Sequence, residues 1–324
     1  MKIPKIELDI ANEITSFNVL LESASVEARK ALVALVVKLE SKIRAELLKI
    51  DGLRTLRDMD GLLRFLASAV NDLQVQGLKV IQKEVREAFS ESIDHLRDLW
   101  EDLLFIKTAS INLPIERTNQ LIKRFYAEGN SIEDLWTRFA ARQRLIMERE
   151  IKIGFTNSEN PKVVTRRILQ RGLKNRANIS TVVQTALNRG ANQARLEFLQ
   201  SRPECKLIFA VATLDGKTTD ICIQRDGKVW TIDGQPVGHG IPFAGGPPFH
   251  PNCRTAIAPK LDLNHKAFKN IPPRQRASMF GPVDAELDYP SWLASLSDAQ
   301  KKAILENATN TTTIKKIRET LRKK

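Results

Sequence analysis

The residues with the clearest potential for chemistry are two cysteines and a histidine in the second half of the chain. Cys222 is followed, after a long loop, by His250 and Cys253, which are three residues apart. Zinc prefers thiolate sulfur and imidazole nitrogen, and a structural zinc site needs four ligands. We therefore predict a structural zinc site here, unless the three side chains simply pack and hydrogen-bond without a metal. The candidates for the fourth ligand are His239, which we include in the predicted site, Asp215 and Asp220.

The same residue types could also serve an enzyme. Asp215, His250 and Cys253 have the composition of a nucleophilic Cys-His-Asp arrangement. The sequence behind this cysteine, however, lacks the helix start or glycine turn that would form an oxyanion hole. A metal-dependent nuclease would need additional carboxylates or another histidine, and none is suitably spaced. We therefore expect no enzymatic activity.

Short strands and turns surround these residues. The apolar, β-branched run at 206–213 predicts a buried strand. A second strand is expected at 228–232, and the Asp-Gly pair at 233–234 predicts a hairpin turn after it. The loop at 238–252 is rich in glycine and proline and leads into a short strand at 254–259. The sequence therefore predicts a small mixed sheet module with a long Cys/His loop.

The first half of the chain has a helical pattern. Apolar residues recur every three or four positions in stretches that begin near Leu32, Asp60 and Ile93, and an Asp-Gly pair at 51–52 separates the first two. Each stretch has one apolar stripe and one charged face. This pattern predicts a helical bundle, and the alternative is an arm that docks in a large assembly.

Further helices are expected over about 115–149, from Pro161, which suits a first helical turn, and from Thr181, where a capping box fits. A short helix at 299–305 and a basic amphipathic helix at 314–324 are expected near the end. The chain is thus predicted to be α+β, with a mainly helical N-terminal region. We divide it into a helical N-terminal region at 1–110, a basic helical connector at 111–200, a small α+β core at 201–260 and an extended and helical basic tail at 261–324.

Positive charge is concentrated in two stretches. The chain has 51 Lys and Arg against 38 Asp and Glu, a net charge of +13. Residues 141–200 carry a net charge of +8 and residues 301–324 one of +6, so the rest of the chain is close to neutral. Such local basicity indicates a polyanionic partner, either DNA or an acidic protein surface, and the alternative is a solvated helix face. The predicted binding residues are Arg166, Arg167, Arg171, Lys174, Arg176 and Arg189.

Signals for export and membrane insertion are lacking in this sequence. The first nine residues contain no apolar core of signal-peptide length. The apolar run at 31–37 is far shorter than the roughly 20 residues that a membrane span needs. Three cysteines do not suit a disulfide framework. We therefore expect a chain without a membrane segment that is made in a reducing cytoplasm.

Two short blocks frame the Cys/His residues. The first, at 215–227, reads Asp-Gly-Lys-Thr-Thr-Asp-Ile-Cys-Ile-Gln-Arg-Asp-Gly, and the second, at 247–254, reads Pro-Pro-Phe-His-Pro-Asn-Cys-Arg. Their order and spacing resemble the phage head-morphogenesis family of minor head proteins, the phage Mu F-like family. The resemblance covers about residues 160–300 and includes an Ala- and Asn-rich helix before the first block. The residues that carry the family motif are Asp215, Lys217, Thr218, Asp226, Gly227, Pro251, Asn252 and Arg254.

The chain departs from the family pattern at two positions. Lys217 stands where arginine is usual, which keeps the charge and loses the planar guanidinium. Thr219 stands where some members have a cysteine that would form a Cys-x-x-Cys pair with Cys222. The family pattern therefore indicates position 219 as a place from which a fourth zinc ligand could come.

The resemblance implies a minor capsid protein of a tailed phage or prophage that associates with the portal and assists head assembly or DNA packaging and delivery. It also implies a location in the virion head near the portal vertex, after synthesis in the host cytoplasm. Its partners would be the portal protein, other head proteins and DNA. The main alternative is a DNA-binding protein with a structural zinc site, and the third is a phage-borne enzyme or toxin. We expect no toxin domain after Pro259, because only about 65 residues follow it.

Overall fold

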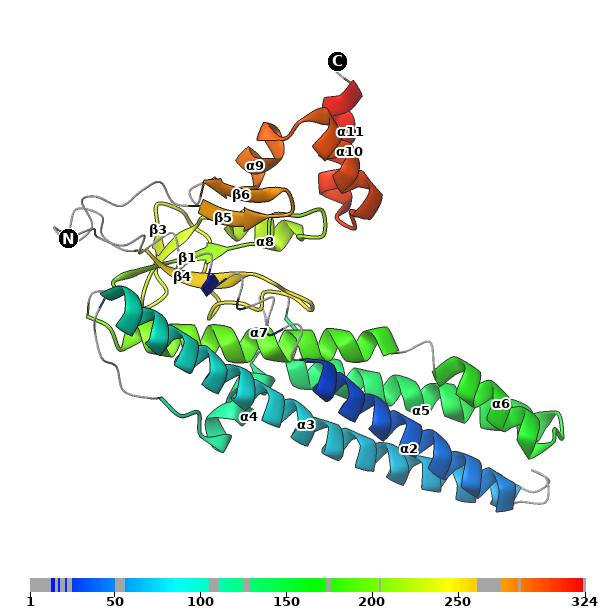
Figure 1. Cartoon of the computed structure of the whole chain (residues 1–324). Coiled ribbons are helices and arrows are strands. Elements are labelled where there is room, and N and C mark those ends of the chain that lie inside the picture. The colour runs from blue at the N-terminus through cyan, green and yellow to red at the C-terminus, as the bar shows by residue number, and fades with distance from the viewer. Residues whose placement is uncertain are drawn as a thin grey trace.

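A bundle of long helices, a small sheet and a group of short C-terminal helices follow one another in space (Figure 1). The predicted α+β class is confirmed. None of the helices described is long and apolar enough to cross a membrane. The computed structural model describes residues 13–14, 17, 21, 25–49, 56–104, 111–124, 129–172, 176–203, 205–260, 275–284 and 287–322.

The N-terminal region consists of helix α2 (Val26–Lys49) and the long helix α3 (Leu56–Leu104). The two stretches that we expected to begin near Asp60 and Ile93 are therefore one continuous helix. No proline interrupts the chain between them, and the apolar spacing continues through the junction, so nothing ends the helix there. The predicted bundle is confirmed, because α3 packs against both α2 and later helices.

Four helices follow, and two of their predicted ends were wrong. The expected helix at 115–149 is divided, because Gly129 adopts a φ of +79° and Ser131 starts a new helix with a capping box to Asp134. The last of the four begins five residues before the predicted capping box at Thr181. The break before Pro161 is confirmed. The helices are α4 (Ile115–Lys123), α5 (Ile132–Thr156), α6 (Pro161–Gly172) and α7 (Arg176–Gln200).

Helix α3 is the centre of the bundle, with α2, α5 and α7 packed against it. Two glycines permit the closest approaches. The indole of Trp136 lies directly on Gly77, and its Nε1 donates to the carbonyl of Gln74 over 3.0 Å. A Cβ on Gly190 of α7 would come within 2.4 Å of the carbonyl oxygen of Val85 on α3. These contacts set the separation of α3 from α5 and α7.

The sheet has the order β3-β2-β1-β4, and every pairing in it is antiparallel, whereas we expected a mixed sheet. The predicted strands and the hairpin turn at 233–234 are confirmed. A short helix that the sequence did not predict, α8 (Asp220–Arg225), lies between the first two strands. The strands are β1 (Leu207–Val211), β2 (Val229–Thr231), β3 (Pro236–Val237) and β4 (Ala256–Lys260).

The C-terminal part contains a second hairpin and three helices. The helices expected at 299–305 and 314–324 are confirmed, with Ser297 as the cap of the first. The hairpin lies in the stretch that we expected to be extended. These elements are β5 (Gln275–Ser278), β6 (Gly281–Asp284), α9 (Tyr289–Ser295), α10 (Asp298–Asn307) and α11 (Thr311–Arg322).

The contact between Gly77 and Trp136 predicts an unusual response to alanine. A Cβ at position 77 would lie 2.0 Å from the Trp136 ring, so Gly77→Ala should destabilise the bundle. Overpacking of this kind costs about 1–3 kcal/mol, more than the ~1 kcal/mol that alanine gains in helix propensity. Gly61→Ala is the matched control, because nothing lies within 4 Å of its Cβ position on the same helix. In urea unfolding, Gly77→Ala should lower the free energy of unfolding and Gly61→Ala should not; equal effects would contradict this packing.

Candidate functional site

The two cysteines and the histidine predicted as ligands meet in the structure. Cys222 lies on α8, whereas His250 and Cys253 belong to the loop before β4. The Sγ atom of Cys222 lies 3.0 Å from Nε2 of His250 and 3.6 Å from Sγ of Cys253. All three residues are buried, and their potential ligand atoms lie within 4.8 Å of one another. The group is therefore close enough to bind one metal ion.

Hydrogen bonds orient the imidazole of His250 toward the sulfur atoms. Its Nδ1 lies 2.7 Å from the carbonyl oxygen of Pro251, so Nδ1 carries the hydrogen and donates it. Nε2 then faces Cys222 and the hydroxyl of Thr219, whose Oγ1 is 2.8 Å away. An Nδ1–H bound to a backbone carbonyl is the arrangement that typically fixes a metal-binding histidine.

The two thiols are not equivalent. The hydrogen bond to Cys253, together with burial, raises the pKa of the Cys222 thiol well above its usual value. Burial alone would also raise the pKa of Cys253, but hydrogen bonds from Cys222 and His250 lower it well below its usual value. The pair therefore favours one thiolate, on Cys253, and one thiol.

The three candidates for a fourth ligand lie outside this group, so the prediction of His239 was wrong. His239 donates from Nε2 to the carbonyl of Val229 over 2.8 Å and accepts at Nδ1 from the Ile241 amide over 3.1 Å. Both ring nitrogens are thus engaged beside Trp230. The side chain that lies beside Cys222, His250 and Cys253, where a fourth ligand would be expected, is that of Thr219.

Asp215 joins the two family blocks to each other. Its carboxylate receives both ends of the Arg254 guanidinium, over 2.6 and 2.9 Å. It also accepts hydrogen bonds from the Lys217 amide and from the amide and hydroxyl of Thr218. Burial alone would raise the pKa of Asp215, but the charge and hydrogen bonds of Arg254 lower it below its usual value. The first and last motif residues therefore form a closed, charge-paired turn.

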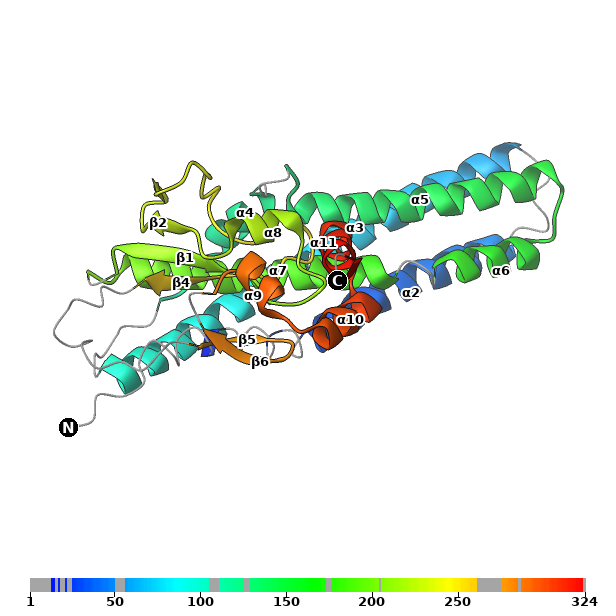
Figure 2. The same ribbon diagram turned by 90° about the horizontal axis from the view of Figure 1, so that it is seen from above.

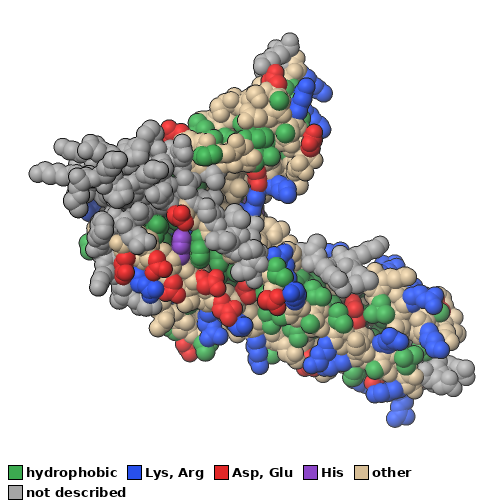
Figure 3. All heavy atoms as spheres, in the orientation of Figure 1, with side chains coloured by type: hydrophobic (Ala, Val, Ile, Leu, Met, Phe, Trp, Pro, Cys, Tyr) green, Lys and Arg blue, Asp and Glu red, His purple; other side chains and the backbone are tan. Residues whose placement is uncertain are grey.

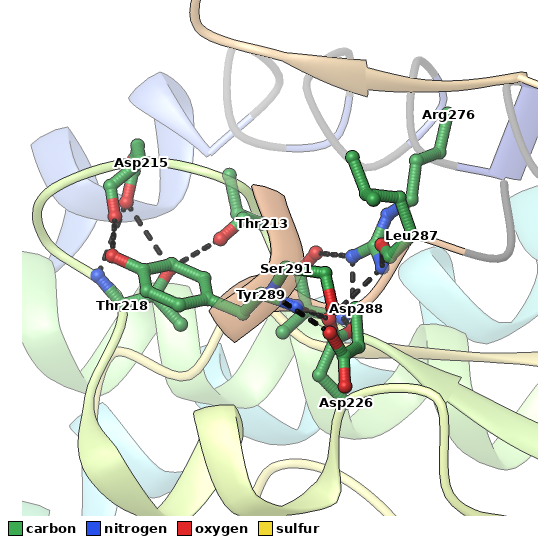
Figure 4. A network of polar contacts seen from close by, with 10 residues as sticks. Thr213, Asp215, Thr218, Asp226, Arg276, Leu287, Asp288, Tyr289 and Ser291 are labelled. Carbon is green, nitrogen blue, oxygen red and sulfur yellow. Dashed lines mark hydrogen bonds and ion pairs between the residues drawn. The ribbon is translucent and has the colours of Figure 1, made fainter. Parts of the chain in front are cut away.

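Asp226, the other motif aspartate, joins the core to the C-terminal part of the chain (Figure 4). Its two carboxylate oxygens each receive a bond of 2.9 Å from the guanidinium of Arg276, on β5. The amides of Ala212 and Tyr289 donate to the same carboxylate over 2.8 and 2.7 Å. Both charged side chains are almost fully buried. Gly227 follows with a φ of +71°, a conformation that explains the glycine in the motif.

The asparagines of α7 attach that helix to the sheet. Asn188 and Asn192 both donate to the carbonyl of Thr255, and Asn192 accepts from the Ile257 amide over 2.9 Å. Asn252 of the second block reaches the same helix, because its side chain donates to the hydroxyl of Thr181 over 3.1 Å. Its backbone has a φ of +60°, which asparagine tolerates. The motif residues therefore build internal contacts between α7, the sheet and the C-terminal part.

Most of the predicted binding arginines are engaged inside the protein. Arg167 and Arg171 form ion pairs with Glu150 of α5, whose side chain is 1% exposed, and thus hold α6 to α5. Arg189 is 1% exposed, so the prediction of a surface role for it was wrong. Arg166 is exposed. Lys174 lies outside the described residues, and Arg176 begins α7.

A different basic surface lies on α5, and although it falls largely within the basic stretch at 141–200, none of its residues was among the predicted binding residues. Four exposed cations follow one face of this helix, at intervals of four, seven and three residues, and make no ion pair with other described residues. We call this face the α5 stripe: Arg138, Arg142, Arg149 and Lys152. At its middle is Leu145, which is 66% exposed. Figure 2 shows α5 along one long edge of the bundle.

Acidic side chains gather elsewhere. Figure 3 shows them over the C-terminal half of α3, whereas lysine and arginine are more frequent toward the far end of the bundle. The exposed carboxylates on this part of α3 include Glu87, Glu91 and Asp98. The surface is therefore electrostatically divided, and the positive charge of the chain is a local property of certain faces.

The module formed by α7, the sheet and the two blocks is the part of the chain that matches a known family. Residues 146–258 match the model of the family described as Phage Mu protein F like protein. The resemblance identified from the two blocks is thereby confirmed over this part of the chain, which includes α6, α7 and all four strands of the main sheet up to Ala258. No curated protein and no solved structure was found to match the chain.

The ion pair between Asp215 and Arg254 predicts a specific dependence of stability on pH. The pKa of Asp215 is lowered by folding, so the unfolded chain binds the proton more tightly at acid pH. The resulting stabilisation is present above the ordinary pKa of aspartate, about 4, and is lost as the pH falls through the lower pKa of the folded state. Between about pH 6 and pH 2, the free energy of unfolding should fall less steeply for Asp215→Asn and for Arg254→Gln than for the unmodified protein. An unchanged slope in both variants would contradict this role.

Proposed function

We propose that this protein is a minor head protein of a tailed phage or prophage that associates with the portal, near the portal vertex of the virion head. There it would assist head assembly or DNA packaging and delivery. The observation that carries this proposal is the family match at residues 146–258. The geometry adds that the motif residues make internal bonds, as expected of a rigid platform for other head proteins.

We also propose that the Cys/His group is not a catalytic centre. Asp215 is held by Arg254, so it does not orient His250 as a Cys-His-Asp arrangement requires. The cavity beside Cys222 and His250 has a volume of only about 20 Å³, about the space of one water molecule. A substrate of any size could not reach the buried sulfur atoms in this conformation.

The α5 stripe is the surface that we expect to meet an acidic partner. Its four cations span about 21 Å along the helix at 1.5 Å per residue, and they are not neutralised by described carboxylates. Leu145 adds an apolar side chain at the centre, which a protein interface can bury and a phosphate backbone cannot use. We therefore favour an acidic protein surface, such as a face of the portal, over DNA.

Charge reversal on α5 tests this proposal. We expect the combined variant Arg138→Glu, Arg142→Glu and Arg149→Glu to lose co-purification with a tagged portal protein of the same phage, because attraction becomes repulsion. The matched control is Lys38→Glu with Arg44→Glu, two exposed cations on α2. Co-purification that survives the α5 changes would exclude this surface, and failure of the unmodified protein to co-purify would count against the portal as partner.

The same variants examine the second candidate function, direct DNA binding. Contact with four phosphates would make the affinity for a short duplex fall about a hundredfold between 50 and 200 mM salt, and the α5 changes would remove most of it. Salt-insensitive or undetectable DNA binding, together with portal binding that needs α5, would support the assembly role alone.

The Cys/His group fits zinc as its metal, and we propose that it holds one zinc ion with a structural role. Ligand atoms around tetrahedral zinc are about 3.5–3.8 Å apart, and the two sulfur atoms are separated by 3.6 Å. The bond from Nδ1 to Pro251 leaves Nε2 of His250 as the atom that faces the sulfur atoms, and Cys253 favours the thiolate form. Cys222, His250 and Cys253 would hold the ion. The fourth coordination position would lie on the side of the group where Thr219 stands.

Elemental analysis checks this proposal. Protein prepared without chelator should contain about one zinc per chain, and Cys253→Ser should lose it. Cys205→Ser is the control, because that buried cysteine packs in the core between α7 and the sheet. Thr219→Cys should bind zinc at least about tenfold more tightly, since it completes the ligand set. Less than a tenth of an equivalent of zinc in the unmodified protein would exclude the proposal.

A further inference from the structure

A groove on the C-terminal part of the chain has no role in the proposals above. It is formed by α9, α10 and α11 together with Ile223 of α8, and its volume is about 390 Å³. These helices lie beyond the sheet, on the side away from the bundle (Figure 1). The apolar part of its wall continues into the core around Trp292. The apolar lining residues are Ile223, Pro290, Leu293, Ala294 and Ile317.

A buried lysine lines this groove without a partner in the described part of the chain. Lys301, on α10, is only 6% exposed. Its ammonium group makes no ion pair with any carboxylate among the described residues, and no hydrogen bond from it is formed there. The aliphatic part of its side chain is covered, and the residue lines the groove, where an anion could pair with its ammonium group. The position therefore favours a bound anion.

Among the polar groups that line the groove, lysines are the ones suited to bind an anion. Lys316 lines the same groove from α11 and is exposed. The hydroxyl of Tyr289 donates to the Asp215 carbonyl over 2.6 Å, and that of Thr320 donates to the Lys316 carbonyl over 2.8 Å. The one acidic lining residue, Glu319, lies 4.0 Å from Lys315. The lining thus combines two ammonium groups, one exposed carboxylate and an aliphatic wall.

We propose that this groove binds an acidic peptide segment of a partner protein, with a carboxylate at Lys301 and Lys316 and aliphatic side chains against Leu293 and Ile317. The charge of the lysines and the aliphatic wall together carry this choice. A single-stranded nucleic acid would stack on exposed aromatic rings, and Tyr289 offers none because it is 1% exposed; phosphates of a duplex would make no use of the aliphatic wall. The inference is independent of the portal contact, since it concerns a different face of the chain.

Capture of defined peptide pools tests the proposal on the intact chain. One pool of dodecapeptides contains only Leu, Ile, Val, Asp and Glu, and its counterpart replaces the acids with Asn and Gln. The immobilised protein should retain the acidic pool at least about tenfold better than the neutral pool. Lys301→Met should abolish this preference, because it keeps the length of the side chain and removes the charge.

Matched variants keep the result interpretable. Lys302→Met removes a neighbouring exposed charge outside the groove and should bind as the unmodified protein does. Lys301→Arg should keep most of the preference, which shows that a loss in Lys301→Met comes from charge and not from misfolding. Equal capture of both pools, or full capture by Lys301→Met, would overturn the proposal. Loss of portal binding in the α5 variant would leave this result unaffected.

Discussion

The buried carboxylate of Asp226 is the contact on which the arrangement of the chain depends. It is 3% exposed and receives the guanidinium of Arg276 and the amides of Ala212 and Tyr289, groups from β5, the end of β1 and the start of α9. A buried ion pair is stabilising only when its remaining bonding positions are filled, and two backbone amides fill those of this carboxylate. Removal of either charge would leave the other uncompensated in the core. This one group therefore bonds the core to both β5 and α9.

A second closure, between Asp215 and Arg254, explains why two blocks so far apart in sequence form one motif. This pair joins the turn after β1 to the start of β4, and it thereby brings the loop that carries His250 and Cys253 over α8. The hydroxyl of Tyr289 bonds to the carbonyl of Asp215, so the two closures are connected. The Cys/His group is therefore positioned by charge pairing around it, even before any metal is considered.

The sequence predicted those parts of the structure whose causes are local. The β-branched run at 206–213 and the Asp-Gly turn at 233–234 identified the sheet, and the pairing of the two blocks identified the three converging ligands. Arg189 could not be placed in this way, because α7 is buried on nearly all sides and its asparagines bond to β4, so its pattern has no polar face. The roles of Arg276 and Glu150 likewise depend on tertiary contacts that no spacing in the sequence indicates.

The two surfaces that we propose for partners lie on different sides of the module that matches the family. The α5 stripe belongs to the bundle, whereas the groove with Lys301 belongs to the C-terminal helices beyond the sheet. Between them, α7 is bonded to β4 through Asn192, and the sheet is bonded to the C-terminal part through Asp226. Both joints are buried, so the family-matched module connects the two surfaces through internal bonds. This arrangement suits a protein that bridges two different components of one assembly. The motif residues would then connect the surface that contacts one component to the surface that contacts the other.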